Sequence, residues 1–365
     1  MNKCIVKSVI CGMDVHEGTI TTCTAAHNGE AEVKTFSNSV EGRNSLIRHL
    51  RGLAKTHCCQ KIATAYEACA LGFCLHDELS DAGMVNFVLA PSLMRKSRKD
   101  MTHKTDPADA RMIFETLRGH LLAGNGLPTV WIPPPELRED RDVVRARLEL
   151  GNKTTKIKEQ IQMLLKKHEV RKPSGMGAAW TMLHRKWLHG LLTCGGPALP
   201  PGGKIVLSSL LRQLAMLEGE IKTLDEEVKA LSRKPRYQVA CQALVKRIKG
   251  VGLLTAMVFL TEVGDLNRFR NRRKLGAFLG LAPTSNESGK VTDRKGHINR
   301  SGAGRVRWAL CQATWVRLQH DEAECAVFDR IRKSSKKLTR VAQTACMRRL
   351  AVLMWHTAKD ALAAA

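Results

Sequence analysis

The chain has 365 residues, 44% hydrophobic and 25% charged, which is enough for two or three folded domains. Its 59 Lys and Arg against 34 Asp and Glu give a formal net charge of +25, which favours a polyanionic partner such as nucleic acid. No apolar run approaches the roughly 20 residues that cross a membrane, and charges come too early for a secretory signal. We expect a cytoplasmic, nucleoid-associated protein with no membrane partner.

The first 120 residues alternate strand and helix patterns. Strand-like segments rich in β-branched residues occupy residues 6–15, 18–26, 30–37, 61–68 and 84–91. Apolar spacing predicts helices at 40–57, at 70–81 and from Pro107 towards Leu117. The order β-β-β-α-β-α-β-α predicts a mixed sheet with helices packed on it, in an α/β domain spanning residues 1–130.

Four carboxylates fall where these elements end or begin. Asp14 and Glu67 end strand-like segments, and Asp106 and Asp109 stand three residues apart at the start of a helix. Such acids can hold two metal ions about 4 Å apart and promote phosphodiester chemistry. Oxygen ligands favour Mg²⁺ or Mn²⁺, so we predict a metal-dependent catalytic site made by these four residues.

Helix capping is the alternative for part of this pattern. Asp106 as N-cap, Pro107 at N1 and an acid at N3 would equally start a helix. Asp14 and Glu67 argue against capping alone, because a strand needs no acid to end it. Lys99 and Lys104, which surround the approach to Asp106, are expected to contact phosphate. A solvated helix or loop face would explain these lysines equally well.

The middle region, residues 131–236, predicts paired long helices. Residues 137–170 form one charged helix, and a Pro/Gly-rich linker lies near 194–204. Eight apolar residues then follow heptad spacing, which predicts a coiled-coil seam: Leu207, Leu210, Leu214, Leu217, Ile221, Leu224, Val228 and Leu231. The seam can pair with residues 137–170 or with another subunit, and we expect a homo-oligomer, either a dimer or a tetramer.

Residues 237–365 predict an all-α unit. The segment IKGVGLLTA suggests a helix-hairpin-helix in which Lys249, Gly250 and Gly252 contact a nucleic-acid backbone. A glycine C-cap followed by a new helix gives the same string. Downstream, Ser288 lies in a polar loop, where turn residues are common. The cations expected to bind nucleic acid there are Lys290, Arg294, Lys295, Arg300, Arg305 and Arg307.

Two sets of motifs together resemble one known family. GMDVH, AYEACALGFCLHDEL, VLAPSL and KTDPADAR resemble the N-terminal DEDD domain of the "one-ten" insertion-sequence transposases, with their "eleven-eleven" subgroup. The long segment at 248–283, then SGK and HINRSGAGRVR, resemble their C-terminal transposase domain. Both sets occur in the right order and span nearly the whole chain.

The resemblance implies a fold and a chemistry. The first domain is expected to have a ribonuclease H (RuvC-like) fold, followed by the coiled coil and the all-α transposase domain. The family's acids map onto Asp14, Glu67, Asp106 and Asp109. Its serine nucleophile maps best onto Ser288, with Ser285 and Ser301 as neighbouring possibilities. The implied function is DNA transposition and recombination, with donor DNA, target DNA and a bridge RNA as partners.

Two positions depart from the family pattern, and two other functions compete with transposition. His16 stands where lysine is common, and Ala303 where asparagine or aspartate often occurs; we expect neither to touch the catalytic groups. A metal-dependent junction resolvase that uses water, with Ser288 only structural, is one rival. A non-catalytic nucleic-acid scaffold is the other.

Overall fold

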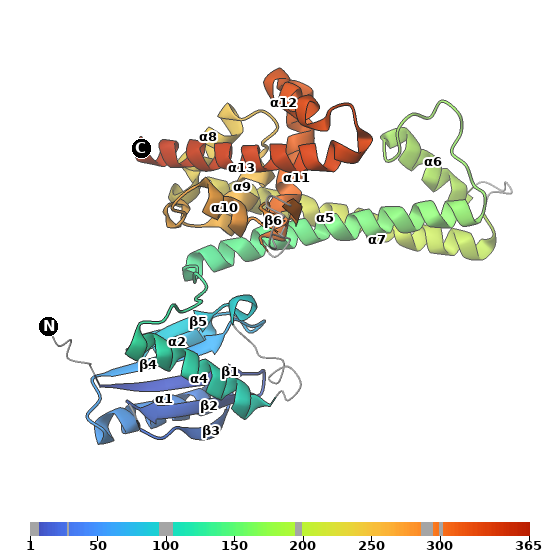
Figure 1. Ribbon diagram of the computed structural model, residues 1–365. Helices are drawn as coiled ribbons and strands as arrows, with labels where there is room; N and C mark the ends of the chain where they lie inside the picture. Colours follow the sequence, from blue (N-terminus) through green and yellow to red (C-terminus); the bar gives the residue numbers. More distant parts are fainter. Residues whose placement is uncertain (1–6, 28, 95–104, 194–198, 286–294, 299–301) are drawn as a thin grey trace. The chain divides into compact units, whose positions relative to one another are not determined.

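The computed structural model describes residues 7–27, 29–94, 105–193, 199–285, 295–298 and 302–365. The chain divides into two compact units, Met1–Ile132 and Pro133–Ala365, which we describe separately (Figure 1). Among the helices of the described residues, none combines the length and the apolarity that crossing a membrane requires.

The first unit contains a five-stranded mixed sheet. Its strands are β1 (Ser8–Val15), β2 (Thr19–Ala26), β3 (Glu32–Ser37), β4 (Lys61–Glu67) and β5 (Val85–Leu89). Its helices are α1 (Val40–Thr56), α2 (Cys74–Asp81), the short η1 (Pro91–Leu93) and α4 (Asp106–Ala123). The strand order is β3-β2-β1-β4-β5; β1, β2 and β3 are antiparallel neighbours, whereas β4 runs parallel to β1 and β5. The predicted mixed sheet is therefore confirmed.

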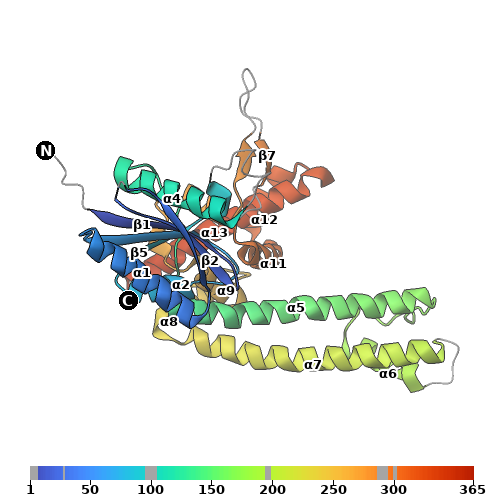
Figure 2. The same cartoon turned by 90° about the horizontal axis from the view of Figure 1, so that it is seen from below.

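The sheet is covered on both faces because alternate strand residues point to opposite sides. Val9, Cys11 and Met13 of β1 pack in one apolar cluster with residues of α1 and α2. Ile10 packs in a second cluster with Ile113 and others of α4. Figure 2 shows α4 on one side of the strands and α1 and α2 on the other.

One glycine controls how closely α4 approaches the sheet. A Cβ atom on Gly12 of β1 would lie 2.2 Å from the amide nitrogen of Phe114 and 2.6 Å from the carbonyl oxygen of Ala110. Both contacts are with helix backbone, so a larger residue would push α4 away. Gly12 thus lets the first turn of α4 reach the end of β1.

The second unit is mostly helical. Its helices are α5 (Pro135–Lys167), α6 (Met182–Thr193), α7 (Pro201–Ser232), α8 (Pro235–Arg247), α9 (Leu253–Val263), η2 (Leu266–Arg268), α10 (Arg272–Phe278), α11 (Gly304–His320), α12 (Glu322–Arg332), η3 (Lys336–Leu338) and α13 (Thr339–Ala363). Two short strands, β6 (Pro283–Ser285) and β7 (Lys295–Ile298), form an antiparallel pair. The prediction of an all-α unit was therefore wrong in this detail, because strands of three and four residues leave no alternating pattern to detect.

Helices α5 and α7 lie side by side and run antiparallel (Figure 2). Val144, near the start of α5, packs in a cluster with Val228 near the end of α7. Towards the other end, Ile161 packs in a cluster with Leu207 and Leu214. The predicted leucine stripe of α7 thus faces a helix of the same chain. Helix α6, which packs in this second cluster, was not predicted.

Buried charges in the second unit have partners of opposite sign. Glu262 in α9 is 8% exposed, and Arg145 donates to its two carboxylate oxygens at 2.7 and 2.9 Å. Asp140 in α5 is 2% exposed and accepts a 2.8 Å hydrogen bond from the hydroxyl of Tyr237. Lys234 and Arg236 complete its ion pairs. Such pairs hold the helices together.

Candidate metal centre

The strand register places two of the predicted acids side by side. Strands β1 and β4 are parallel, with Met13 paired to Tyr66. Asp14 and Glu67 are the next residues of each strand, so they lie at the same level and point to the same face. Ala65, two residues before Glu67, belongs to the cluster that α4 covers. Both acids therefore stand on the face where α4 begins.

Helix α4 adds the other two acids to this end of the sheet. Ala110 lies over Gly12, so Asp106, one helical turn earlier, lies over the residues that follow Gly12. Asp109 is close enough to Asp14 for its charge to change the Asp14 pKa. The topology thus brings residues from three distant stretches of sequence to one place.

The structure also changes the interpretation of capping. Helix α4 has Thr105 as its N-cap and Asp106 as its first residue, so it begins one residue earlier than the capping alternative required. The Thr105 side chain makes no capping hydrogen bond. The carboxylate of Asp106 instead approaches a histidine, at 3.5 Å from its Nε2 atom. Asp106 as N-cap is therefore wrong.

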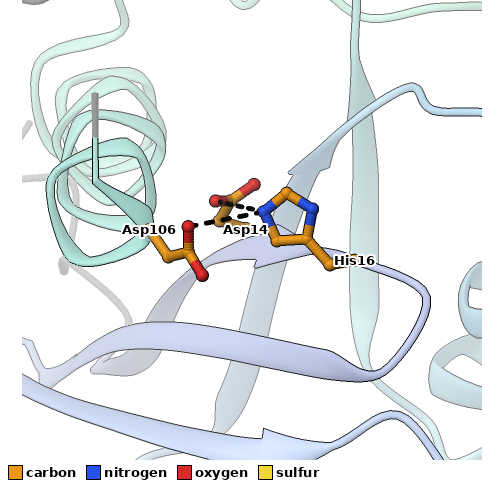
Figure 3. A group of neighbouring side chains, drawn as sticks. All are labelled: Asp14, His16 and Asp106. Carbon is orange, nitrogen blue, oxygen red and sulfur yellow. Dashed lines mark hydrogen bonds and ion pairs between the residues drawn. The ribbon is translucent and has the colours of Figure 1, made fainter.

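His16 is the residue that sequence reasoning missed. Its Nε2 lies 3.1 Å from Oδ2 of Asp14 and 3.5 Å from Oδ1 of Asp106 (Figure 3). The expectation that His16 does not touch the acidic groups was wrong. A usable signal was present, since residues two apart at a strand end project to the same side.

These three side chains fit a divalent metal ion. One ligand atom from each of Asp14, His16 and Asp106 lies within 4.8 Å of the others. Carboxylate oxygens suit Mg²⁺ and Mn²⁺, and an imidazole nitrogen is a good ligand for the more tolerant transition metals. Glu67 and Asp109, although placed at this end of the sheet, are outside this close group.

The electrostatics of the group favour a cation. Partial burial raises the pKa of Asp14, and the negative charges of Asp109 and Asp106 raise this pKa further, while His16 opposes the shift. A charged Asp14 is thus poorly compensated by its surroundings. A bound divalent cation would supply the missing positive charge.

The predicted helix-hairpin-helix glycines lie between α8 and α9. Gly250 has φ +86°, and a Cβ on it would lie 2.7 Å from the carbonyl oxygen of Ala313 in α11. Packing against α11 therefore requires a glycine here. Lys249 donates to the carbonyl of His320 at 3.1 Å. Gly252 is the N-cap of α9, and no atom lies within 4 Å of a Cβ added to it. The nucleic-acid role of these residues remains a prediction.

The other predicted binding residues have mixed positions. Arg305 is exposed at the start of α11, and Arg307 donates to the carbonyl of Leu279 at 2.9 Å. Ser285 and Lys295 lie in β6 and β7. Ala303 is the N-cap of α11. Several predicted residues lie outside the described part of the chain: Lys99, Lys104, Ser288, Lys290, Arg294, Arg300 and Ser301.

Two family models match the chain. A DEDD-type model described as "Transposase" matches residues 11–169, and a model described as "Transposase IS116/IS110/IS902 family" matches residues 242–328.

Individual relatives carry similar names. Two proteins of Sinorhizobium fredii with transposase names, y4qE and y4rJ, are 28% and 32% identical to this chain. The first alignment covers 96% of this chain and 88% of the relative, and the second covers 68% and 64%. The transposase for insertion sequence element IS1111A of Coxiella burnetii is 33% identical over 36% of this chain and 34% of its own length.

Proposed function

The chain belongs to the IS110 family of transposases, which are DNA strand-transfer enzymes, and from this premise we propose a division of work between its two units. The first unit positions and activates the DNA phosphate that is cut. The second unit carries the nucleophile and grips nucleic acid. The observation that carries this proposal is the meeting of Asp14, His16 and Asp106 at the end of the sheet, beside Glu67.

A DEDD domain implies a divalent metal, and the residues at the sheet end suit one. We propose Asp14, Glu67, Asp106 and Asp109 as its ligands, with Mg²⁺ or Mn²⁺ as the ion. A bound ion of this kind neutralises charge on the scissile phosphate and stabilises the leaving oxygen. His16 would orient the carboxylates of Asp14 and Asp106 or contribute a nitrogen ligand. A histidine ligand favours Mn²⁺ over Mg²⁺.

Ser288 is the proposed nucleophile, on the strength of the family resemblance of its SGK motif. Its Oγ would attack the phosphorus and form a phosphoserine bond, while the bond to the leaving deoxyribose oxygen breaks and that oxygen takes a proton. The new ester retains the bond energy, so rejoining needs no external energy source. Ser285 and Ser301 remain the alternatives for this role.

Further partners belong to the same proposal. The leucine stripe of α7 is proposed to act as a coiled coil in a dimer or tetramer, in addition to its contact with α5. A bridge RNA that pairs with donor and target DNA is proposed from the resemblance, within an "eleven-eleven" type of element. Lys249, Gly250 and Gly252 are proposed to contact a nucleic-acid backbone. The place of action would be the bacterial nucleoid.

Strand cutting by the purified protein tests the metal-dependent part. The substrate is supercoiled plasmid DNA carrying the element ends together with the RNA transcribed from the flanking DNA. We expect nicking or recombination with Mg²⁺ or Mn²⁺, none in EDTA, and none with Asp106→Asn. Glu115→Gln is the matched control, because Glu115 is an exposed acid on the same helix. Full activity of Asp106→Asn would contradict the proposal.

A covalent adduct separates the transposase mechanism from a resolvase that uses water. A serine nucleophile leaves the protein attached to labelled DNA after denaturation, and Ser288→Ala abolishes the attachment. A resolvase cuts DNA with no adduct in either protein. A scaffold binds DNA without cutting it, whether or not metal is present.

A further inference from the structure

The second unit contains a large groove that none of the sequence motifs indicated. It lies along α13 and is also lined by residues of α10, the paired strands β6 and β7, α11, α12 and η3. Figure 1 shows α10 and β6 close to α13. The volume is about 1520 Å³, beyond the roughly 300–1,000 Å³ of most small-molecule sites. A groove of this size can accommodate a segment of a polymer.

The groove is strongly basic. Seven of its lining residues are arginine or lysine, against one acid, Glu324: Arg272, Arg273, Arg317, Lys337, Arg340, Arg348 and Arg349. Glu324 is already engaged, at 3.0 Å from Arg349 and 3.8 Å from Arg317. Within the described part of the chain, five of the cations make no ion pair: Arg272, Arg273, Lys337, Arg340 and Arg348.

These cations lie at the surface: Arg272, Arg273, Lys337 and Arg340 are exposed, and Arg348 is half-buried. Like charges gathered in one groove repel one another, and an anion bound there would relieve this repulsion. Arg348 is also positioned by packing. A Cβ on Gly276 of α10 would come within 3.3 Å of its Nε atom, so the glycine leaves room for the arginine. The packing of α10 against α13 therefore places the Arg348 guanidinium beside Gly276.

The lining fits a sugar–phosphate backbone better than stacked bases. No Phe, Tyr or Trp is among the described lining residues, so aromatic stacking is absent from this groove. Between the cations lie Val341, Ala345 and Val352, which offer apolar contact to sugars. Arg340 and Arg348 are eight positions apart on α13, about 12 Å at 1.5 Å per residue. Along the axis of a DNA duplex, where each strand carries one phosphate per about 3.4 Å of axis, this length spans roughly three to four phosphates of one strand.

We propose that this groove holds the phosphate backbone of a DNA strand through Arg340 and Arg348, with Arg272, Arg273 and Lys337 alongside. The inference rests on the proposed function and extends it, because it assigns DNA contact to α10 and α13 in addition to the glycine turn at Gly250 and the loop around Ser288. Contacts to phosphate are independent of base sequence. The groove therefore contributes affinity and register, and leaves the choice of site to other parts of the complex.

Binding of the full-length protein to fluorescent 30-nucleotide DNA, single-stranded and duplex, and to RNA of the same length tests this inference. The test variant is Arg340→Gln with Arg348→Gln. The control is Arg330→Gln with Lys333→Gln, which removes the same charge from exposed positions at the end of α12 outside the groove. Circular dichroism melting checks that both variants fold. All binding is measured in EDTA, so a failure of the metal site does not affect the result.

We expect the groove variant to lose about tenfold or more in DNA affinity, and its salt slope (log K against log salt) to fall by about two, one per lost phosphate contact. The control should change less than threefold. Equal losses in the groove variant and the control, or unchanged binding in the groove variant, would overturn the proposal. A loss confined to RNA of the same length would overturn the assignment to DNA.

Discussion

The acidic end of the sheet in the first unit and the basic groove of the second unit are opposite in charge. In both regions, side chains of like charge lie close together. At the sheet end, the charges of Asp106 and Asp109 raise the pKa of Asp14. In the groove, Arg340 and Arg348 lack carboxylate partners among the described residues. Both regions gather like charges, and a bound ion of the opposite sign would compensate them.

Charged pairs elsewhere in the second unit provide the contrast. Glu262 is buried with Arg145, and Asp140 is buried with Tyr237 and two cations. These groups are satisfied within the chain and need no ligand. The comparison suggests that pairing marks charges that stabilise the fold, whereas crowding of like charges marks charges that bind something.

The largest expected effect distinguishes the function of the acidic end of the sheet from that of the basic groove. Asp14→Asn should reduce strand cutting by about 1,000-fold or more, because it removes a ligand for an ion worth several kcal/mol in the transition state. DNA affinity in EDTA should stay within threefold of wild type. The assay pairs plasmid cutting with fluorescence anisotropy. An Asp14→Asn protein that cut normally would remove the distinction between the regions.

Substitution of a paired charge should instead lower the stability of the fold. Arg145→Ala leaves Glu262 buried without its bidentate partner and should lower the free energy of unfolding of the second unit by about 3–5 kcal/mol. Urea denaturation followed by circular dichroism measures this change. Adding Glu262→Gln should recover part of the loss. A single variant as stable as wild type would mean that the pair does not support the fold.

Gly12 links fold and site in the first unit. Gly12→Ala puts a methyl group against the backbone of α4 and should cost about 1–3 kcal/mol, with weaker metal binding because Asp106 moves. Gly18→Ala is the control, since no atom lies within 4 Å of its added Cβ. Thermal melting and titration calorimetry with Mn²⁺ report the two effects. Equal melting temperatures for both variants would contradict the close approach of α4.

The smallest expected effect is a gain in stability, in contrast to the losses of activity and stability predicted above. Because the pKa of Asp14 is raised, the folded state holds this proton more tightly than the unfolded chain. The resulting stability is present below the ordinary aspartate pKa of about 3.9 and is lost as pH rises through the raised value. In EDTA, Asp14→Asn should therefore melt about 1–2 °C above wild type at pH 7. The difference should vanish near pH 4; a constant difference would exclude this cause.

Much of the first unit was predictable, because local patterns determine it. Segments rich in β-branched residues predicted the strands. Asp14 and Glu67 were recognised as candidate site residues because a strand needs no acid to end it. His16 was missed because it was judged by its departure from a family pattern rather than by its two-residue spacing from Asp14. The start of α4 was placed one residue too late because Thr105 and Asp106 are both common N-caps.

Several features of the second unit could not be predicted from sequence patterns. The leucine stripe predicted α7, but heptad spacing does not determine which helix it meets. The basic groove takes residues from Arg272 to His356, contributed by several separate elements, and no motif joins them. Gly250 looked like a phosphate-binding glycine, whereas its packing against α11 gives it a structural reason.

The central claim is that Asp14 and Asp106 bind a divalent cation, and anomalous X-ray scattering from crystals grown with Mn²⁺ tests it most directly. We expect a strong anomalous peak within about 2.5 Å of a carboxylate oxygen of each residue. Saturating Mn²⁺ that gave no peak there, or a peak only at another place on the protein, would contradict it.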